Sequence, residues 1–451
     1  MTNTFFFFLG SFDDFLWGYL GVPIIILLGI FLTIRSNFFQ IRKFPIIVRT
    51  FFHYFTTREK SGKGIHPLKA FFACIGGCVG VSNIVGVCTA IQIGGPGALF
   101  WIWLTAMLGM IMKYAEVYLG IRYRVVNKDG GCNGGPMYYL QQITSKKWVP
   151  ALFCILMCVY GVEVYQFSVI TESVSSNFSL HRGVVGATLL FLVFFAGSGG
   201  VRRVGNISSA LIPTFIFLYM GMGMWVLIQN FSAVPGVLRQ VFSTAFTGSS
   251  AFGGFVGSSL ILTVSQGVRR GCYTTDVGVG YASIIHSEST IESAERQASL
   301  VIVDIFLDTF IICTMSVCLI LVTGIWNEPL EAAMLVQTIF SEYFPFMDFF
   351  MPLFLFLLGY STITAYFLVG AKCAEFVSPT RGRFYFYLYS ITALALSAFV
   401  DTSQSQTVMA IAGGLLLIIN CWGIYRLHKE VSYSLGKEYP WLLATDCQAG
   451  P

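Results

Sequence analysis

Long runs of apolar residues alternate with short polar segments along almost the whole chain. Because about 20 apolar residues cross the hydrocarbon core of a bilayer, each run of that length predicts a membrane-spanning helix. Eleven such runs lie near residues 15–34, 69–93, 97–119, 149–172, 184–199, 207–230, 251–268, 300–323, 350–371, 384–400 and 407–425. The pattern therefore predicts an all-α polytopic membrane protein with eleven transmembrane helices.

The composition supports a membrane protein and argues against a soluble or nucleic-acid-binding protein. Only 11% of the residues are charged and the mean hydropathy is +0.73, whereas a soluble domain carries about 25% charged residues. The net charge of +5 is spread over several loops, which argues against a nucleic-acid partner. The expected surroundings are a lipid bilayer.

The basic residues test the predicted helices, because Lys and Arg concentrate in cytoplasmic loops. One set of alternate loops holds Arg35, Arg42, Lys43, Arg49, Arg58, Lys60, Lys63, Arg122, Arg124, Lys128, Lys146, Lys147, Arg202, Arg203, Arg269, Arg270, Arg296, Lys372, Arg381, Arg383, Arg426, Lys429 and Lys437, and the opposite set holds only Arg182 and Arg239. This asymmetry predicts a multi-pass protein of the cell (inner) membrane, with the N-terminus outside and the C-terminus in the cytoplasm. The first residues lack the basic start of a signal peptide, so we expect them to be retained.

The stretch 71–97, FFACIGGCVGVSNIVGVCTAIQIGGPG, has the length of a spanning helix but is interrupted at its centre by glycines and by Ser82 and Asn83. Hydrocarbon offers no partner for a freed backbone N–H or C=O, so an open backbone at this depth survives only against protein or a water-filled cavity. Small residues that let helices pack closely are the alternative explanation. The first explanation predicts a broken helix that can hold a ligand.

A second stretch, 245–268, is interrupted in a similar way by Gly253, Gly254 and Gly257 and by four serines. It is the seventh predicted span and the first interruption is in the second, so the two cross in opposite senses, as an inverted five-plus-five repeat requires. The predicted divisions are an external N-terminus and extra helix (1–34), a basic amphipathic cytoplasmic segment (35–68), two repeats (69–230 and 231–425) and a cytoplasmic tail (426–451).

Two interrupted helices at these positions predict a binding site near the bilayer midplane. N–H groups at a half-helix N-terminus attract a carboxylate, and freed carbonyls at the other half coordinate a small cation. A zwitterionic amino acid with a co-transported sodium ion fits both. Metal or redox chemistry is not expected, because the twelve cysteines include no CxxC pair and nine of them lie in apolar runs.

Several long motifs resemble the alanine or glycine:cation symporter family, also called the sodium:alanine symporter family. They are IGGPGALFWIW (93–103), MKYAEVYLGIRYRV (112–125), GGPMYYL (134–140), the segment 242–257, and YSTITAY followed by GAKC (360–373). The resemblance covers nearly the whole chain. It implies the fold of the bacterial leucine transporter and symport of a small neutral amino acid, such as alanine or glycine, with sodium and without any other cofactor.

The candidate residues come from the interrupted stretches, from polar residues within the spans and, by position, from the resemblance. The substrate set is Gly77, Gly80, Val81, Ser82, Gln166, Gly253, Gly254, Thr362 and Tyr366, the sodium set is Gly80, Asn83, Ser361 and Thr362, and a gate or coupling set is Lys113, Glu116, Glu163 and Asp308. The first break would offer backbone N–H groups to the substrate carboxylate. This chain reads GVSN at 80–83, where the family usually has GTGN, and has Tyr366 where the family often has Trp.

Other polar residues within the predicted spans leave alternatives open. Glu163, one turn before Gln166, could meet the substrate ammonium, carry a proton or bond a neighbouring helix. Ser361 and Thr362 could bind sodium or their own i−4 carbonyls. Lys113 and Glu116 share a helix face and predict an ion pair or an inner gate, and Asp304 and Asp308 also share a face.

The motif TTDVGVG (274–280) replaces NEAGLG of the family and is expected, with His286, in a cytoplasmic loop. No nucleophile or metal-ligand set accompanies the carboxylates, so an enzyme is not expected. The sequence therefore predicts a sodium-coupled amino-acid symporter that works by alternating access. An ion-conducting channel or a non-transporting amino-acid sensor on the same fold is the alternative.

Overall fold

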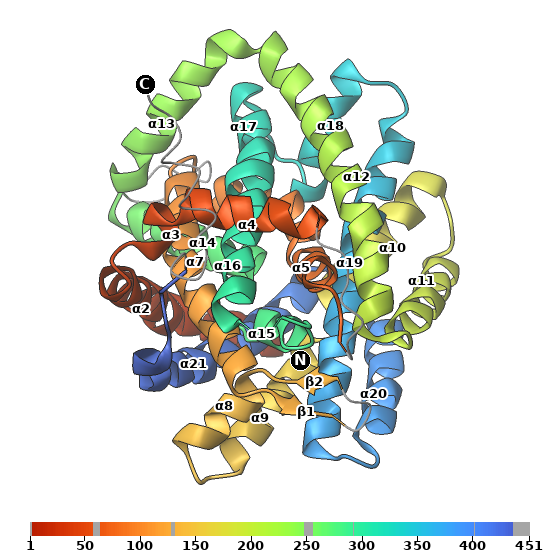
Figure 1. The fold of residues 1–451 in the computed structure, drawn as a ribbon. Coiled ribbons are helices and arrows are strands. Elements are labelled where there is room, and N and C mark those ends of the chain that lie inside the picture. The colour runs from red at the N-terminus through yellow and green to blue at the C-terminus, as the bar shows by residue number, and fades with distance from the viewer. Residues whose placement is uncertain are drawn as a thin grey trace.

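The computed structural model describes residues 2–56, 64–127, 131–247, 256–291, 293–400 and 402–435, which form a helical protein with one short hairpin (Figure 1). The elements in chain order are α1 (Thr2–Phe15), α2 (Val22–Arg35), α3 (Phe39–Arg42), α4 (Phe44–Thr56), α5 (Pro67–Cys78), α6 (Val85–Gly94), α7 (Ala98–Arg122), β1 (Val125–Val126), β2 (Cys132–Asn133), α8 (Pro136–Ile143), α9 (Trp148–Tyr160), α10 (Val164–Phe178), α11 (Arg182–Gly197), α12 (Gly200–Gln229), α13 (Val234–Thr247), α14 (Val256–Thr275), α15 (Tyr281–His286), α16 (Ala294–Ile305), α17 (Thr314–Val322), α18 (Ala332–Tyr343), α19 (Met347–Val377), α20 (Gly382–Ser397) and α21 (Thr402–Leu427). Short π-helical segments join α1 to α2 and α16 to α17.

Among the described residues, 7 helices are long and apolar enough to cross a membrane. They are Phe6–Arg35, Ala98–Arg122, Trp148–Phe178, Gly200–Gln229, Ala294–Val322, Met347–Val377 and Thr402–Glu430, and shorter apolar helices cover Pro67–Cys78, Val85–Gly94 and Arg182–Gly197. Large apolar side chains such as Phe191 and Phe217 are exposed on α11 and α12, as expected for surfaces that contact lipid. The prediction of an all-α membrane protein is confirmed.

The predicted amphipathic segment after the first span forms α3 and α4. One face of α4, with Ile47, Phe51 and Tyr54, is buried and packs across α5 and α16 (Figure 1). The opposite face is exposed at Phe52 and Phe55. The α4 helix therefore packs against both α5, the first half of the broken helix, and α16.

The first predicted interruption is confirmed. The helix α5 ends at Cys78, a short 3₁₀ turn covers Val81–Asn83, and α6 starts at Val85. Val79 and Gly80 are extended between them. All of these residues are buried, so the open backbone lies against protein, as the chemistry of hydrocarbon requires.

The structure shows a second helix break that was not predicted, further along the chain than the predicted interruption. Gly253 and Gly254 fall outside the described residues, and α14 runs without interruption to Thr275. The chain then opens over residues 276–280 and resumes as α15 at Tyr281. Asp276, Gly278 and Gly280 all have positive φ, at 51°, 75° and 96°, a conformation that glycine adopts readily and that a helix cannot contain. The TTDVGVG motif is thus a helix break and not a solvent-exposed loop.

The unbroken helix α7 supports this second break. Gly109 of α7 lies so close to the break that an added Cβ would come within 2.6 Å of Val277 Cγ2, and a Cβ on Gly120 would come within 2.6 Å of Ser283 Cβ. Close approach at glycines is how membrane helices pack tightly. The α7 helix therefore holds α14, the break and α15 in register.

One end of the helix bundle is closed by contacts between loops, near the β1–β2 hairpin in Figure 1. Ile65 pairs with Ser289 in an isolated parallel bridge. Arg124 donates to the carbonyls of Ser289 and Ile291 at 2.9 and 3.0 Å, and Lys372 forms an ion pair with Glu288. These contacts tie the chain after α15 to the segments that precede α5 and follow α7.

Candidate functional site

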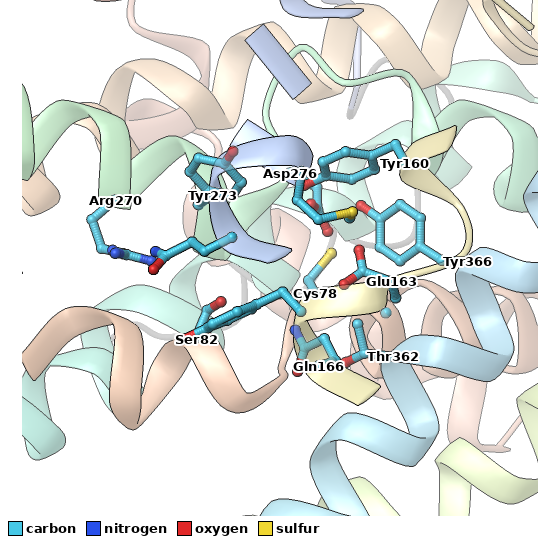
Figure 2. A pocket seen from close by; sticks show the side chains of 14 residues that line it. Cys78, Ser82, Tyr160, Glu163, Gln166, Arg270, Tyr273, Asp276, Thr362 and Tyr366 are labelled. Carbon is cyan, nitrogen blue, oxygen red and sulfur yellow. The ribbon is translucent and has the colours of Figure 1, made fainter. Parts of the chain in front are cut away.

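A polar cavity lies where the two broken helices meet (Figure 2). Its volume is about 20 Å³, so in this conformation it has room for about one water molecule. It is lined by Gly77, Cys78, Ser82, Tyr160, Glu163, Tyr165, Gln166, Arg270, Tyr273, Asp276, Thr362, Tyr366, Gln406 and Met409. Five of the predicted substrate residues, Gly77, Ser82, Gln166, Thr362 and Tyr366, and one predicted gate residue, Glu163, are therefore brought together.

Hydrogen bonds hold the first break in its open shape. Gly80 donates its backbone N–H to Asn83 Oδ1, and Val81 donates its own to Gln166 Oε1, both at 2.9 Å. A Cβ on Gly80 would come within 2.7 Å of Gln166 Nε2 and Thr362 Oγ1, so only glycine lets these side chains approach. Two of the N–H groups expected to bind the substrate carboxylate are thus already bonded inside the protein.

The far side of the first break rests on α16 and the segment that follows it. Asn83 donates its amide to Asp308 and to Cys313 Sγ, the latter at 3.2 Å, and Asp308 also accepts from Thr309 Oγ1 at 2.9 Å. Asn83 and Asp308 are fully buried. The predicted sodium ligand Asn83 and the predicted coupling residue Asp308 therefore form a pair behind the cavity.

Oxygen atoms from two helices converge beside the cavity. Thr362 Oγ1 on α19 lies 3.3 Å from the carbonyl oxygen of Gly76, 3.5 Å from that of Val79 and 3.2 Å from that of Leu358. The carbonyls of Gly76 and Val79 are at the C-terminal end of α5, where the helix dipole is negative. The neighbouring Ser361 hydroxyl bonds that of Ser208 on α12 at 2.8 Å.

Aromatic rings form one wall of the cavity. Tyr366 stacks on Tyr281 with ring centroids 4.1 Å apart and meets Tyr160 edge-on at 5.3 Å. Tyr281 donates its hydroxyl to the carbonyl of Ala73 at 2.8 Å, whereas the buried Tyr366 hydroxyl has no hydrogen-bond partner within the described chain. The Tyr366 hydroxyl lies beside the Asp276 carboxylate in the cavity.

Two carboxylates face the same wall. Glu163 stands between α9 and α10 with a positive φ of 54°, and Asp276 lies in the second break, and Figure 2 shows both near Tyr366. Their exposed fractions are 5% and 3%. Neither carboxylate forms an ion pair with any residue that the structure describes. A ligand with a positive charge would compensate them.

Lys113 and Glu116 do not pair with each other, so that prediction is wrong. Lys113 donates to Asp304 Oδ2 at 2.7 Å, to the carbonyl of Thr275 at 2.8 Å and to Cys78 Sγ at 3.1 Å. Glu116 accepts from Asn420 Nδ2 at 2.9 Å and from the Gly280 N–H at 3.2 Å. The Lys113 and Glu116 side chains are therefore each bonded to groups outside α7.

A cluster of possible metal ligands lies next to Lys113. Ligand atoms of Cys74, Cys78 and Asp304 lie within 4.8 Å of one another. The Lys113 ammonium already contacts two of these groups and supplies the positive charge that a metal ion would bring. Lys113, and not a metal ion, therefore balances the charge of Asp304.

Two further predictions are corrected. His286 is fully buried at the end of α15, with Nδ1 2.6 Å from Gln297 Nε2, and so does not lie in an open loop. Arg269 and Arg270 belong to α14 and not to a basic loop. Arg269 pairs with Asp13 and Asp14 of α1.

Sequence reasoning missed eight of the residues that line the cavity, among them Asp276, Arg270, Tyr273 and Gln406. The first three were assigned to a loop because the seventh span was expected to end near residue 268, whereas α14 continues to Thr275. Gln406 lies on α21, which carried no motif. The signal that could have found them was an arginine pair within reach of a spanning helix, because an intramembrane charge is by default functional or paired.

Comparison with known proteins agrees with this geometry. The profile of the sodium:alanine symporter family matches residues 2–445. An uncharacterized transporter of Haemophilus influenzae is 32% identical over 434 residues, which covers 94% of each chain. The sodium/alanine symporter AgcS of Methanococcus maripaludis is 28% identical over 93% of this chain and 94% of its own, and a probable sodium/glutamine symporter, GlnT of Bacillus subtilis, is 29% identical over 95% and 90%.

Solved structures share the fold. The transporter MhsT in complex with L-phenylalanine superposes with a TM-score of 0.59 at 15% identity over 82% of this chain and 90% of its own. A Na⁺-coupled sialic acid symporter superposes with a TM-score of 0.54 at 10% identity over 91% and 87%. The fold is therefore that of the leucine-transporter type, and a family of transporters excludes an enzyme. With a cavity between two broken helices and a family profile along nearly its whole length, the chain belongs to the sodium:alanine symporter family.

Proposed function

We propose that this protein is a secondary transporter that moves a small neutral amino acid together with sodium by alternating access. The observation that carries the proposal is the polar cavity at the junction of the two helix breaks, with an oxygen cluster beside it. This is the arrangement in which half-helix ends and freed carbonyls bind a substrate and its coupling ion.

The substrate would lie between Ser82, Gln166 and Tyr366. The stacked tyrosines would contact its aliphatic part, and Glu163 with Asp276 would face its ammonium group. The relatives are named for alanine and for glutamine, so the small neutral class, alanine or glycine, rests on the family resemblance.

The sodium ion would bind among the carbonyls of Gly76 and Val79 and the Thr362 hydroxyl. Hard cations prefer such oxygen ligands, and the C-terminal end of α5 adds the negative end of its dipole. A single charge that falls through the membrane potential gains about 2.3 kcal/mol per 100 mV. Of the other predicted ligands, Asn83 has its oxygen bonded to the Gly80 N–H, and Ser361 bonds Ser208.

The architecture that fits this function has eleven spans, with α5–α6 and α14–α15 as the second and seventh. The two broken spans keep the five-span separation of an inverted repeat after the second break is moved to residues 276–280. We place the segment with the β1–β2 hairpin, which holds Arg122 and Arg124, in the cytoplasm. An ion channel remains the second candidate function. A conductive path through the loop contacts around Arg124, which close one end of the helix bundle, would favour it.

The test is uptake of labelled alanine into proteoliposomes, with and without a sodium gradient, against competing amino acids. Thr362→Ala is expected to raise the sodium concentration for half-maximal uptake about tenfold, because one oxygen ligand is lost. Thr362→Ser should stay within about twofold, and Thr392→Ala, which removes an exposed hydroxyl on α20, should change nothing. Saturable uptake that ignores the sodium gradient would refute the coupling, and the absence of any amino-acid competitor would refute the symport.

A further inference from the structure

Arg270 is a buried cation without a buried anion. Its side chain comes from α14, is 4% exposed and lines the cavity. No carboxylate among the described residues forms an ion pair with it, and its Nε has no hydrogen-bond partner there. A buried guanidinium in such surroundings carries a large desolvation cost.

The adjacent arginine shows what compensation looks like in the same helix turn. Arg269 has two carboxylates, those of Asp13 and Asp14 on α1. Among the described residues, Arg270 instead has two neutral partners: the ring of Tyr273, whose centroid is 6.0 Å from Arg270 Cζ, and the amide of Gln406. In the orientation that satisfies both groups, the Gln406 oxygen accepts from the two Nη atoms at 3.2 and 2.8 Å. Within the part of the chain that the structure describes, Arg269 therefore forms ion pairs and Arg270 does not.

The surroundings of the guanidinium are shaped to keep it in the cavity. Gly86, in the first turn of α6, gives it room, since a Cβ there would come within 2.7 Å of Arg270 Nη1. The N-terminal end of α6 carries the positive end of the helix dipole, which adds to the demand for an anion. Figure 2 shows Arg270 on one side of the cavity and Glu163 and Asp276 on the other.

The cavity thus has a positive end and a negative end, and its ligand should be dipolar in the opposite sense. The geometry points to Arg270 as the residue that binds a carboxylate of the transported amino acid, an inference that rests on the proposed function. It takes over the role predicted for the backbone N–H groups of Gly80 and Val81, which are bonded within the protein. The carboxylate is either the α-carboxylate, which every amino acid has, or a side-chain carboxylate, which only acidic ones have.

Binding to the purified full-length protein in sodium-containing buffer tests this inference, by calorimetry or by ligand-induced thermal shift. The probes are alanine, alaninamide, which keeps the ammonium but lacks the carboxylate, and glutamate. Wild-type protein is expected to bind a carboxylate ligand at least tenfold more tightly than its amide. Arg270→Gln should weaken binding of the carboxylate ligand about 10- to 100-fold, the loss of one charged hydrogen-bond pair, and leave alaninamide unchanged.

The source of the carboxylate follows from the same data. If Arg270→Gln weakens alanine and glutamate alike, Arg270 binds the α-carboxylate. If only glutamate is weakened, it binds a side-chain carboxylate. The inference would be overturned if Arg270→Gln matched the wild type both in the ratio of its alanine and alaninamide affinities and in its affinity for glutamate.

Two further variants separate recognition from folding. Gln406→Glu keeps Arg270 but gives it an internal carboxylate, and is expected to weaken carboxylate ligands at least tenfold; an unchanged affinity would overturn the inference. Arg239→Gln removes an exposed arginine of α13 and should bind as wild type does. Sodium-driven uptake by the wild type is measured in parallel, so failure of the proposed function shows there and failure of the inference shows only in Arg270→Gln and Gln406→Glu.

Discussion

Lys113→Met should destabilise the protein by about 3–5 kcal/mol. The Lys113 ammonium and the Asp304 carboxylate are both fully buried and 2.7 Å apart. Removal of the ammonium leaves a buried carboxylate uncompensated, and breaking one partner of such a pair costs about this much. The second oxygen of Asp304, Oδ1, has no hydrogen-bond partner among the described residues, and the neutral thiols of Cys74 and Cys78 near Oδ2 do not replace the lost positive charge.

The assay is equilibrium unfolding of the purified protein in mixed detergent micelles, followed by tryptophan fluorescence. Lys113→Met with Asp304→Leu replaces the pair with apolar groups and should recover most of the loss, because an apolar pair of similar volume is often as stable as a buried ion pair. Lys147→Met, an exposed lysine, should lie within about 0.5 kcal/mol of the wild type. If Lys113→Met costs less than about 1 kcal/mol, or the double variant is no better than the single one, the pair does not hold the fold as argued.

Two further substitutions test the cavity walls. Glu163→Gln should weaken substrate binding about tenfold and alter the pH profile of uptake, because it removes a titratable carboxylate from the cavity; uptake and a pH profile that match those of the control Glu328→Gln would remove Glu163 from the mechanism. Gly77→Ala should cost about 1–3 kcal/mol in unfolding free energy, because the added Cβ would lie 2.1 Å from Tyr281 Oη; Gly221→Ala, with open space around it, is the neutral control, and equal stability of the two variants would contradict the packing argument.

The first break could be predicted because its cause is local. Glycines and polar side chains within an otherwise apolar run make an uninterrupted helix unfavourable, and α5 does end at Cys78. The break after α14 was missed because Gly and Ser content was taken as the signal. The actual break depends on backbone conformation, with positive φ at Asp276, Gly278 and Gly280. Such a sequence of left-handed residues is visible in DVGVG only if conformation, and not hydropathy, is considered.

The arginines of α14 were misplaced for a related reason. Two adjacent basic residues are typical of a cytoplasmic loop, and they were assigned to one although they directly follow a predicted span. Their partners, Asp13 and Gln406, lie on the first and last described spanning helices. Contacts between residues that are 256 positions apart in the chain arise from tertiary packing, which periodicity and spacing do not encode.

For the motif KYAE, the predicted shared helix face is correct but the predicted ion pair is wrong. Lys113 and Glu116 do share one face of α7, as their spacing predicts, yet that face points at the second helix break. Lys113 donates to the carbonyl of Thr275, where α14 ends, and Glu116 accepts from the N–H groups of Gly280 and Ser283, where α15 begins.

A cation thus meets the negative end of one half-helix, and an anion meets the positive end of the other. The Lys113 and Glu116 side chains therefore cap the two half-helix ends at the break, where the backbone groups have no partners within their own helices. Because Lys113 also contacts Cys78, at the end of α5, any motion of α7 that opens one break must disturb the other. The Lys113 ammonium therefore connects the two helix breaks, alongside the hydrogen bond from Tyr281 on α15 to the carbonyl of Ala73 on α5.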